Sequence, residues 1–224
     1  MPRRALAEHR PFLLLSIAAA IAYYLTANGP LPGTASMLVK GAGVGLLSVY
    51  ALRRHAGNDA KLLALVMALA AIGDVAMEID YAVGGAAFFA SHCAAMALYL
   101  RHRRSDMSSS QRLFAAALLI FTPLIAWLLV AANDDALQIA IYALVLGGMA
   151  GLAWTSSFPR YRVGMGAVLF VISDLLIFAR MGIWATSPVP GHLIWPTYYI
   201  GQFLIATGVI QTLRSNSAGE LGEP

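Results

Sequence analysis

The chain has 224 residues, of which 59% are hydrophobic and only 12% are charged, and its mean hydropathy is +0.71. Soluble domains carry about a quarter charged residues, so this composition excludes an ordinary soluble protein and predicts an integral membrane protein. The single cysteine, Cys93, excludes an internal disulfide and a cysteine-rich metal site. The net charge of +4 comes from basic residues between apolar segments, where they set topology, so we expect no nucleic-acid partner.

Eight apolar segments are each long enough to cross a membrane as a helix, which takes about 20 residues. They cover residues 11–27, 32–52, 61–82, 84–101, 112–132, 136–155, 162–182 and 192–213. We therefore predict an all-α integral membrane bundle of eight transmembrane helices, formed as one domain over residues 1–213 and followed by a short disordered tail over 214–224. The first segment follows two arginines, as a secretory signal does. Tyr23 and Tyr24 stand where a cleavage site needs small residues, so we expect an uncleaved span.

The basic residues are distributed unevenly over the connections between these segments. Lys and Arg occur near the amino terminus, in the second, fourth and sixth connections and in the tail, whereas the alternate connections carry none except Arg180 near one segment end. Cytoplasmic connections of membrane proteins carry the excess of Lys and Arg. We therefore expect both termini to be cytoplasmic, in a multi-pass protein of a bacterial inner membrane.

Four ionisable side chains lie deep inside the apolar segments: Lys40, Asp74, His92 and Asp174. A charged residue at the centre of a membrane helix costs roughly 2.5–3.5 kcal/mol on insertion scales, so each must face a partner or a wet cavity. Counted from the outer end of its own segment, each lies about eight residues in, or ~12 Å deep at about 1.5 Å per residue. This shared depth predicts one polar cavity in the outer half of the bundle.

Further polar residues bracket this depth. Glu78 follows Asp74 by four residues in the expected third span, which places both on one helix face. Tyr198 and Gln202 lie at a similar depth in the last span. A structural interpretation also stays open for Tyr198 and Gln202, as simple polar contacts between helices.

The ionisable residues have structural interpretations as well. Lys40 can reach outward to the interface or form a structural ion pair with Asp74, and His92 can be a hydrogen-bonded core histidine. Asp74 and Asp174 are too short to reach the interface, so a functional interpretation is favoured for both.

Two acids in one buried cavity support acid–base chemistry. Burial disfavours the charged form of a carboxylic acid, and two nearby acids cannot easily both ionise. One of Asp74 and Asp174 is therefore expected to hold a proton near neutral pH as a general acid, while the other stays charged beside Lys40. A zinc site needs three or four His, Cys or carboxylate ligands, and His92 is the only deep histidine, so we expect neither a metal nor another cofactor.

One motif occurs twice. The sequence Gly84-x-x-x-Phe88-x-x-Ser91-His92 resembles Gly166-x-x-x-Phe170-x-x-Ser173-Asp174. The copies lie in the expected fourth and seventh spans, which run in opposite directions, as in an inverted repeat. Chance similarity in a chain rich in Gly and Phe is the alternative.

The polar residues also follow one another in a distinctive order. The order is Lys40 in the second span, Gly73-Asp74 in the third, Gly85 to His92 with Phe88 and Phe89 in the fourth, Phe170-x-x-Ser173-Asp174 in the seventh and Tyr198-Tyr199-x-x-Gln202 in the eighth. This set resembles the YhhN-like membrane proteins, which include lysoplasmalogenases, over nearly the whole chain. One departure is Gly41, where the family often has proline, and it concerns the local shape of the second span.

This resemblance implies a reaction and its substrate class. Lysoplasmalogens are single-chain glycerophospholipids with a vinyl ether bond, which the enzymes hydrolyse to a fatty aldehyde and a glycerophospho-alcohol. Asp74 and Asp174 are then expected to divide the roles of proton donor and charge stabiliser, in an order that the resemblance does not assign, while His92 orients water. Lys40 is expected to hold the lipid phosphate or to tune the acids.

The remaining candidates are expected to bind the substrate. They are Glu78, Ser173, Tyr198, Tyr199 and Gln202, and the tyrosine rings suit a choline or ethanolamine cation. The expected partners are thus a lyso-lipid substrate and the lipid bilayer. Two other functions remain open: a proton-coupled carrier of a small lipid or amine, which needs a polar path to both faces, and a non-catalytic lipid-binding protein.

Overall fold

A computed structural model describes residues 11–26 and 33–220, and this part of the chain is almost entirely helical. It contains eight α-helices and one π-helical turn in the described residues, where the only β pairing is an isolated bridge between Arg103 and Ser156. The all-α class predicted from the sequence is confirmed. The basic residues before position 11, the turn at residues 28–30 and residues 221–224 lie outside the described residues.

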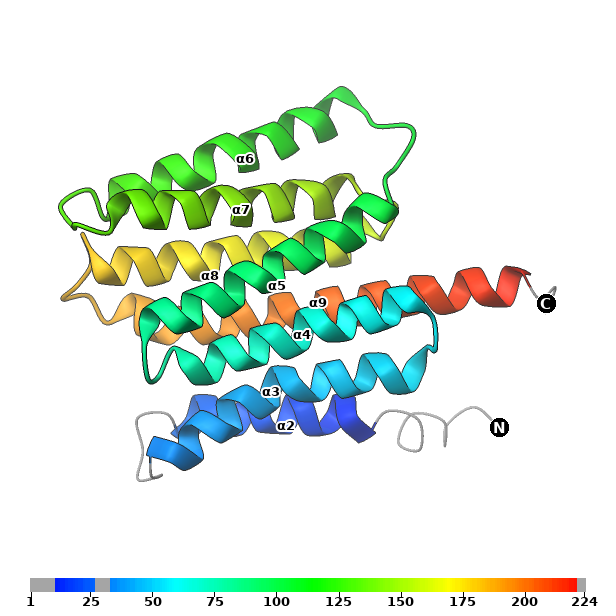
Figure 1. Ribbon diagram of the computed structural model, residues 1–224, viewed down its shortest axis with the longest axis horizontal. Coiled ribbons are helices and arrows are strands. Elements are labelled where there is room, and N and C mark those ends of the chain that lie inside the picture. The colour runs from blue at the N-terminus through cyan, green and yellow to red at the C-terminus, as the bar shows by residue number, and fades with distance from the viewer. Residues whose placement is uncertain (1–10, 27–32, 221–224) are drawn as a thin grey trace. The chain divides into compact units, whose positions relative to one another are not determined.

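The helices follow one another with short connections (Figure 1). They are α2 (Pro11–Thr26), α3 (Gly33–Arg54), α4 (Asn58–Ala76), α5 (Tyr81–Arg101), α6 (Ser109–Leu129), α7 (Ala136–Thr155), the π-helical η1 (Arg160–Gly164), α8 (Met165–Met181) and α9 (Val189–Glu220). In the described chain six segments are long and apolar enough to cross a membrane: α3, α5, α6, α7, the run Arg160–Met181 and α9. These segments indicate a multi-pass membrane protein.

The other two helices explain why the eight-span topology remains a prediction. Helix α2 is apolar but has only 16 residues, which is short for the hydrocarbon core. Helix α4 contains Asp59, Lys61 and Asp74, which is more charge than an apolar span usually carries. The cytoplasmic location of both termini likewise remains a prediction.

The boundary between α4 and α5 differs from the prediction, which continued the third span to residue 82. Helix α4 ends at Ala76, and α5 already begins at Tyr81. The reason is a cap: the Asp80 carboxylate accepts hydrogen bonds from the backbone N–H groups of Ala82 (2.7 Å) and Val83 (3.0 Å), which satisfies donors that the first turn of a helix leaves free. Glu78 therefore lies in the turn between the helices and not in a longer helix, as was predicted, although Glu78 and Asp74 both act on Lys40.

Helix α9 also extends beyond its predicted end. It continues to Glu220, so residues 214–220, expected in a disordered tail, are helical. No proline interrupts this stretch, and the hydroxyl groups of Ser215 and Ser217 donate to backbone carbonyl groups one turn back. A polar composition alone does not end a helix that lacks a stop signal.

The chain divides into two compact units, residues 1–91 and 92–224, which are described separately. In the first unit α2 packs on α3 and α3 packs on α4. Ser16 donates a hydrogen bond to the carbonyl of Gly43, and a Cβ atom at Gly41 would lie 2.6 Å from Val75 of α4. The glycines of α3 thus let neighbouring helices approach closely, and α3 continues unbroken through Gly41.

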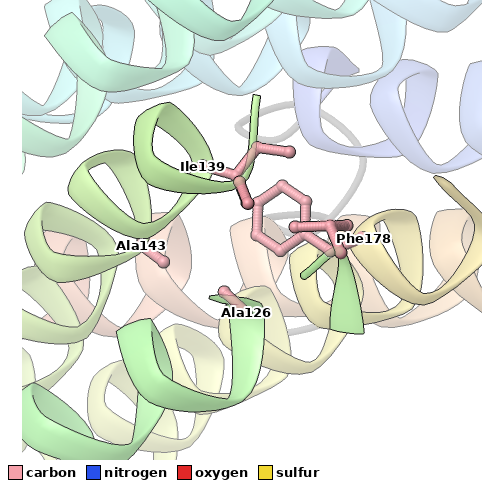
Figure 2. Packing of buried hydrophobic residues seen from close by; sticks show 6 residues of the cluster. Ala126, Ile139, Ala143 and Phe178 are labelled. Carbon is pink, nitrogen blue, oxygen red and sulfur yellow. The ribbon is translucent and has the colours of Figure 1, made fainter. Parts of the chain in front are cut away.

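In the second unit α6 pairs with α7 and α8 pairs with α9 (Figure 1). Gly166 of α8 and Gly201 of α9 face each other, because a Cβ atom on either would lie 2.6 Å from the carbonyl oxygen of the other. An apolar cluster joins α6, α7 and α8: Ala126, Val130, Ala136, Ile139, Ala143 and Phe178. Figure 2 shows the ring of Phe178 beside Ile139, with Ala126 and Ala143 close by.

Candidate active site

The predicted site residues fall into two groups, one in each unit. Lys40, Asp74 and Glu78 lie in the first unit. His92, Ser173, Asp174, Tyr198, Tyr199 and Gln202 lie in the second. Each group is described by itself, and the single cavity expected to hold both aspartates stays a prediction.

In the first unit, Lys40 is surrounded by acidic groups. Its Nζ atom lies 2.5 Å from Oε1 of Glu78, with 16% and 40% of the two side chains exposed. Asp74, which is only 3% exposed, also acts electrostatically on Lys40. Lys40 thus forms an ion pair with Glu78, and Asp74 contributes a second negative charge nearby. Because one ammonium group faces two carboxylates, this group of side chains has no excess of positive charge.

Tyr23 belongs to the same group, although the sequence analysis did not assign it to the site. The Lys40 ammonium lies 5.7 Å from the centre of the Tyr23 ring, within the range of a cation–π contact. Tyr23 also interacts electrostatically with Glu78 and Asp74. The signal for Tyr23 in the sequence was a hydroxyl group within the apolar run of residues 11–27. Tyrosines are so common near membrane interfaces that this signal did not distinguish Tyr23 as a site residue.

In the second unit, three side chains from three helices form a continuous hydrogen-bonded chain. Nε2 of His92 in α5 lies 3.0 Å from the hydroxyl oxygen of Tyr142 in α7. The Tyr142 hydroxyl donates to Oδ2 of Asp174 in α8 over 2.7 Å. His92 is 1% exposed and Asp174 is 5% exposed. The fold therefore joins two of the predicted catalytic residues through a third residue.

Tyr142 is the residue that sequence reasoning missed. Tyr142 is a single tyrosine in the apolar segment 136–155, and it belongs neither to the four deep ionisable residues nor to a repeated motif. Its depth was the usable signal, because Tyr142 lies a few residues from the expected outer end of that segment, close to the predicted polar layer.

Aromatic rings pack against the hydrogen-bonded side chains. The Phe170 ring meets the His92 ring edge to face, with centroids 4.9 Å apart, and meets the Tyr198 ring in the same way at 5.1 Å. Phe178 contacts Tyr142 with a centroid distance of 6.0 Å, and through Phe178 the site adjoins the apolar cluster of Figure 2. Such apolar surroundings strengthen hydrogen bonds between buried groups.

The motif that occurs twice has a consistent structural role. Ser91 donates a hydrogen bond to the carbonyl of Val66 (2.9 Å), which belongs to α4. Ser173 donates to the carbonyl of Ile194 in α9 (3.0 Å). Each serine joins its helix to a neighbouring one, and the next residue, His92 or Asp174, is an end of the hydrogen-bonded chain. The hydroxyl proton of Ser173 is thus already engaged, which leaves its oxygen lone pairs for a ligand.

A model of the YhhN family matches residues 35–209, which is most of the chain. The chain belongs to the YhhN family. The matched range runs from α3 into α9 and contains every residue that carried the resemblance in the sequence. No curated protein and no solved structure matches the chain.

Gln202 is the most unusual polar residue of this YhhN-family protein. Its side chain is 1% exposed, and its Nε2 atom is buried without a hydrogen-bond partner among the described residues. Gln202 lies one helical turn after Tyr198, whose ring contacts Phe170. A buried amide donor left unpaired costs about 1–3 kcal/mol, so it is a natural donor for a ligand oxygen.

The neighbouring residues of α9 supply aromatic surface. Trp195 stacks on Tyr199 with a centroid distance of 6.0 Å and an angle of 21° between the rings. Tyr198 is buried. Among the described residues, no three His, Cys, Asp or Glu side chains gather as metal ligands do.

Proposed function

We propose that this YhhN-family protein is a membrane-embedded lysoplasmalogenase, which hydrolyses the vinyl ether bond of a lysoplasmalogen to a fatty aldehyde and a glycerophospho-alcohol. The observation that supports this most strongly is the setting of Asp174. Its carboxyl group is buried in an apolar helix, and its hydrogen bond within the described chain comes from the neutral hydroxyl of Tyr142. Burial favours the protonated form of a carboxylic acid.

A protonated carboxyl group suits the first step of vinyl ether hydrolysis. The β-carbon of the vinyl ether takes a proton, and the electron pair of the double bond forms the new C–H bond. The product is an oxocarbenium ion, which adds water to give a hemiacetal. The hemiacetal then breaks into the aldehyde and the alcohol. Because Tyr142 donates to Oδ2 of Asp174, Oδ1 is the oxygen available to carry the reacting proton.

Asp74 fits the complementary role. Its electrostatic partner is Lys40, and a carboxyl group near an ammonium group is held as the anion. An anion stabilises an oxocarbenium ion that forms beside it. We therefore propose the acid role for Asp174 and charge stabilisation for Asp74.

The contacts of Lys40 favour one of its two expected roles. The ammonium group is already paired with Glu78 and acts on Asp74, so its charge tunes the acids and is not free to hold a phosphate. We assign substrate binding to Gln202, whose amide can donate to an oxygen of the lipid, and to the aromatic faces of Tyr198 and Tyr199.

The test is a side-by-side assay of the purified protein in detergent. It receives a lysoplasmalogen and an ester-linked lyso-lipid, and fatty aldehyde and fatty acid are measured separately. We expect aldehyde only, formed without any ion gradient, which a proton-coupled carrier does not do.

A matched pair of variants identifies the acid in this assay. Asp174→Asn should lower kcat by about 100-fold or more, the usual contribution of a general acid. Asp135→Asn is the control, because Asp135 is exposed and its side chain makes no capping hydrogen bond. A folded protein that releases no aldehyde, or an Asp174→Asn variant with full activity, would overturn the proposal.

A further inference from the structure

We infer that Tyr142 is the positioning residue of a proton relay, which links His92 to Asp174 and returns a proton to Asp174 after each protonation of substrate. The inference rests on the proposed function for the identity of the reaction. The relay itself rests on three side chains of the second unit and on the two hydrogen bonds that join them.

The directions follow from counting protons. A tyrosine hydroxyl carries one proton, and that of Tyr142 is donated to Oδ2 of Asp174. The 3.0 Å contact with His92 can then be a hydrogen bond only if Nε2 of His92 carries a proton and donates it to the Tyr142 oxygen. The two hydrogen bonds therefore run in the same direction, from His92 to Tyr142 and from Tyr142 to Asp174.

This order allows the relay to restore the acid during water addition. Once Oδ1 of Asp174 has given its proton to the β-carbon, Asp174 is a carboxylate and the substrate is an oxocarbenium ion. Water forms a C–O bond to that ion and loses a proton to Nδ1 of His92. Nε2 of His92 passes its proton to Tyr142, and Tyr142 passes its own proton to Oδ2 of Asp174. Asp174 is again a neutral acid, and His92 carries its proton on Nδ1.

Breakdown of the hemiacetal runs the relay in reverse. The hemiacetal hydroxyl loses its proton to Oδ1 of Asp174, and Oδ2 returns a proton through Tyr142 to Nε2 of His92. Nδ1 of His92 then protonates the departing ether oxygen as its C–O bond breaks. The aldehyde and the alcohol are released, and all three side chains regain their first protonation states without an oxidant, a reductant or a further co-reactant.

The surroundings of the three hydrogen-bonded side chains suit a proton relay. The rings of Phe170 and Phe178 contact His92 and Tyr142 edge to face, and His92 and Asp174 are buried, which limits the exchange of their protons with bulk water. A purely structural role, in which the three side chains only hold α5, α7 and α8 together, predicts a loss of stability but no effect on how protons move during turnover.

Tyr142→Phe is the decisive variant, because it removes one oxygen atom and keeps the ring. We expect kcat to fall by about 10- to 100-fold, within the lower range of proton-transfer contributions, with KM little changed. The dependence of kcat on the fraction of D₂O should be curved in the wild type, since several protons move together, and linear in Tyr142→Phe. Tyr99→Phe is the matched control, because Tyr99 is a buried tyrosine of the second unit that packs against Phe158 and is not one of the three hydrogen-bonded side chains.

A second variant tests whether the residues act as a unit. His92→Gln keeps an amide donor for Tyr142 but cannot take a proton at a second nitrogen. If the relay operates, the double variant His92→Gln/Tyr142→Phe should lose no more activity than the more impaired single variant. Full additivity of the two losses would contradict the relay.

A measurement without turnover separates this inference from the proposed function. The infrared band of the protonated Asp174 carboxyl group, identified by its loss in Asp174→Asn, should shift in Tyr142→Phe and stay in place in Tyr99→Phe. If the wild type forms no aldehyde, the proposed function fails, while the shifted band still supports the hydrogen-bonded chain. An unshifted band, or an active wild type whose kcat and D₂O dependence survive in Tyr142→Phe, would overturn the inference.

Discussion

The chemical role that a single residue of this protein can take depends on the residues that it contacts. Lys40 was expected to meet a phosphate or Asp74, and it is paired with Glu78 from the turn after α4. Asp174 and His92 were expected from the sequence to share one polar layer, and Tyr142 joins them. At the residue scale, charge balance and hydrogen-bond partners therefore favour one proposed role of a side chain over another where residue type alone leaves both open.

The charge balance around Lys40 predicts how Lys40→Met will behave. If Lys40 tunes the acids, the substitution should lower kcat to a similar degree for a lysoplasmalogen and for the corresponding 1-alkenylglycerol, which lacks the phosphate. If Lys40 binds phosphate, only the phospholipid should be affected, mainly through KM. The control is Lys61→Met, since Lys61 is exposed and is the only other lysine of the chain.

The unpaired amide of Gln202 predicts opposite effects on stability and on binding. Gln202→Leu removes a buried donor that has no partner in the described chain, so thermal stability in detergent should stay the same or rise. The KM for the lipid should rise if the amide donates to a substrate oxygen.

Gln111→Leu is a useful comparison for that variant. Gln111 is also buried, but its side chain accepts a hydrogen bond from the backbone of Ser108 in the cap of α6, so the same substitution should cost about 1 kcal/mol. A destabilised Gln202→Leu protein with unchanged KM would contradict the assignment of Gln202.

At the scale of elements, small residues and caps determine where helices meet and end. The close contact of α8 and α9 occurs at Gly166 and Gly201, one turn from Phe170 and Tyr198. The cap at Asp80 ends the turn after α4 and starts α5. These contacts fix the depth at which the polar side chains of each helix lie, and so they position the site.

The contact between α8 and α9 predicts a sensitivity to single methyl groups. Gly166→Ala would place a Cβ atom 2.6 Å from the carbonyl oxygen of Gly201 and 2.9 Å from Ile205. Because backbone atoms cannot move aside easily, thermal stability should fall, by about 1–3 kcal/mol. Gly191→Ala is the control, since a Cβ atom there meets nothing within 4 Å. Equal melting temperatures of the two variants would show that the helices can separate at no cost.

At the scale of the whole molecule, the described helices indicate a multi-pass membrane protein, and charge placement predicts its orientation. A cysteine-free background is available through Cys93→Ser, because Cys93 is the only cysteine. Cys93 is exposed on α5 in the structure, which places it on an outer surface of an apolar helix, where we expect lipid.

That background allows a direct test of topology by thiol labelling. Ser105→Cys lies in the α5–α6 connection and Thr186→Cys in the α8–α9 connection, and both positions are exposed. With the amino terminus in the cytoplasm, a membrane-impermeant maleimide should label the second variant in intact spheroplasts and the first only after lysis. The reverse pattern, or labelling of both from outside, would contradict the predicted orientation.

The sequence by itself determined the all-helical class, the multi-pass membrane character and the family, because the lengths of apolar runs and the order of polar residues can be read without any knowledge of packing. It also identified Asp74, His92 and Asp174, since ionisable groups in apolar segments are conspicuous. Only the tertiary structure decided that Glu78 lies in a turn and pairs with Lys40, and that Tyr142 connects His92 to Asp174. Helix packing determines which residues that are far apart in the sequence come into contact. The spacing between a residue and its neighbours in the sequence carries no information about these contacts.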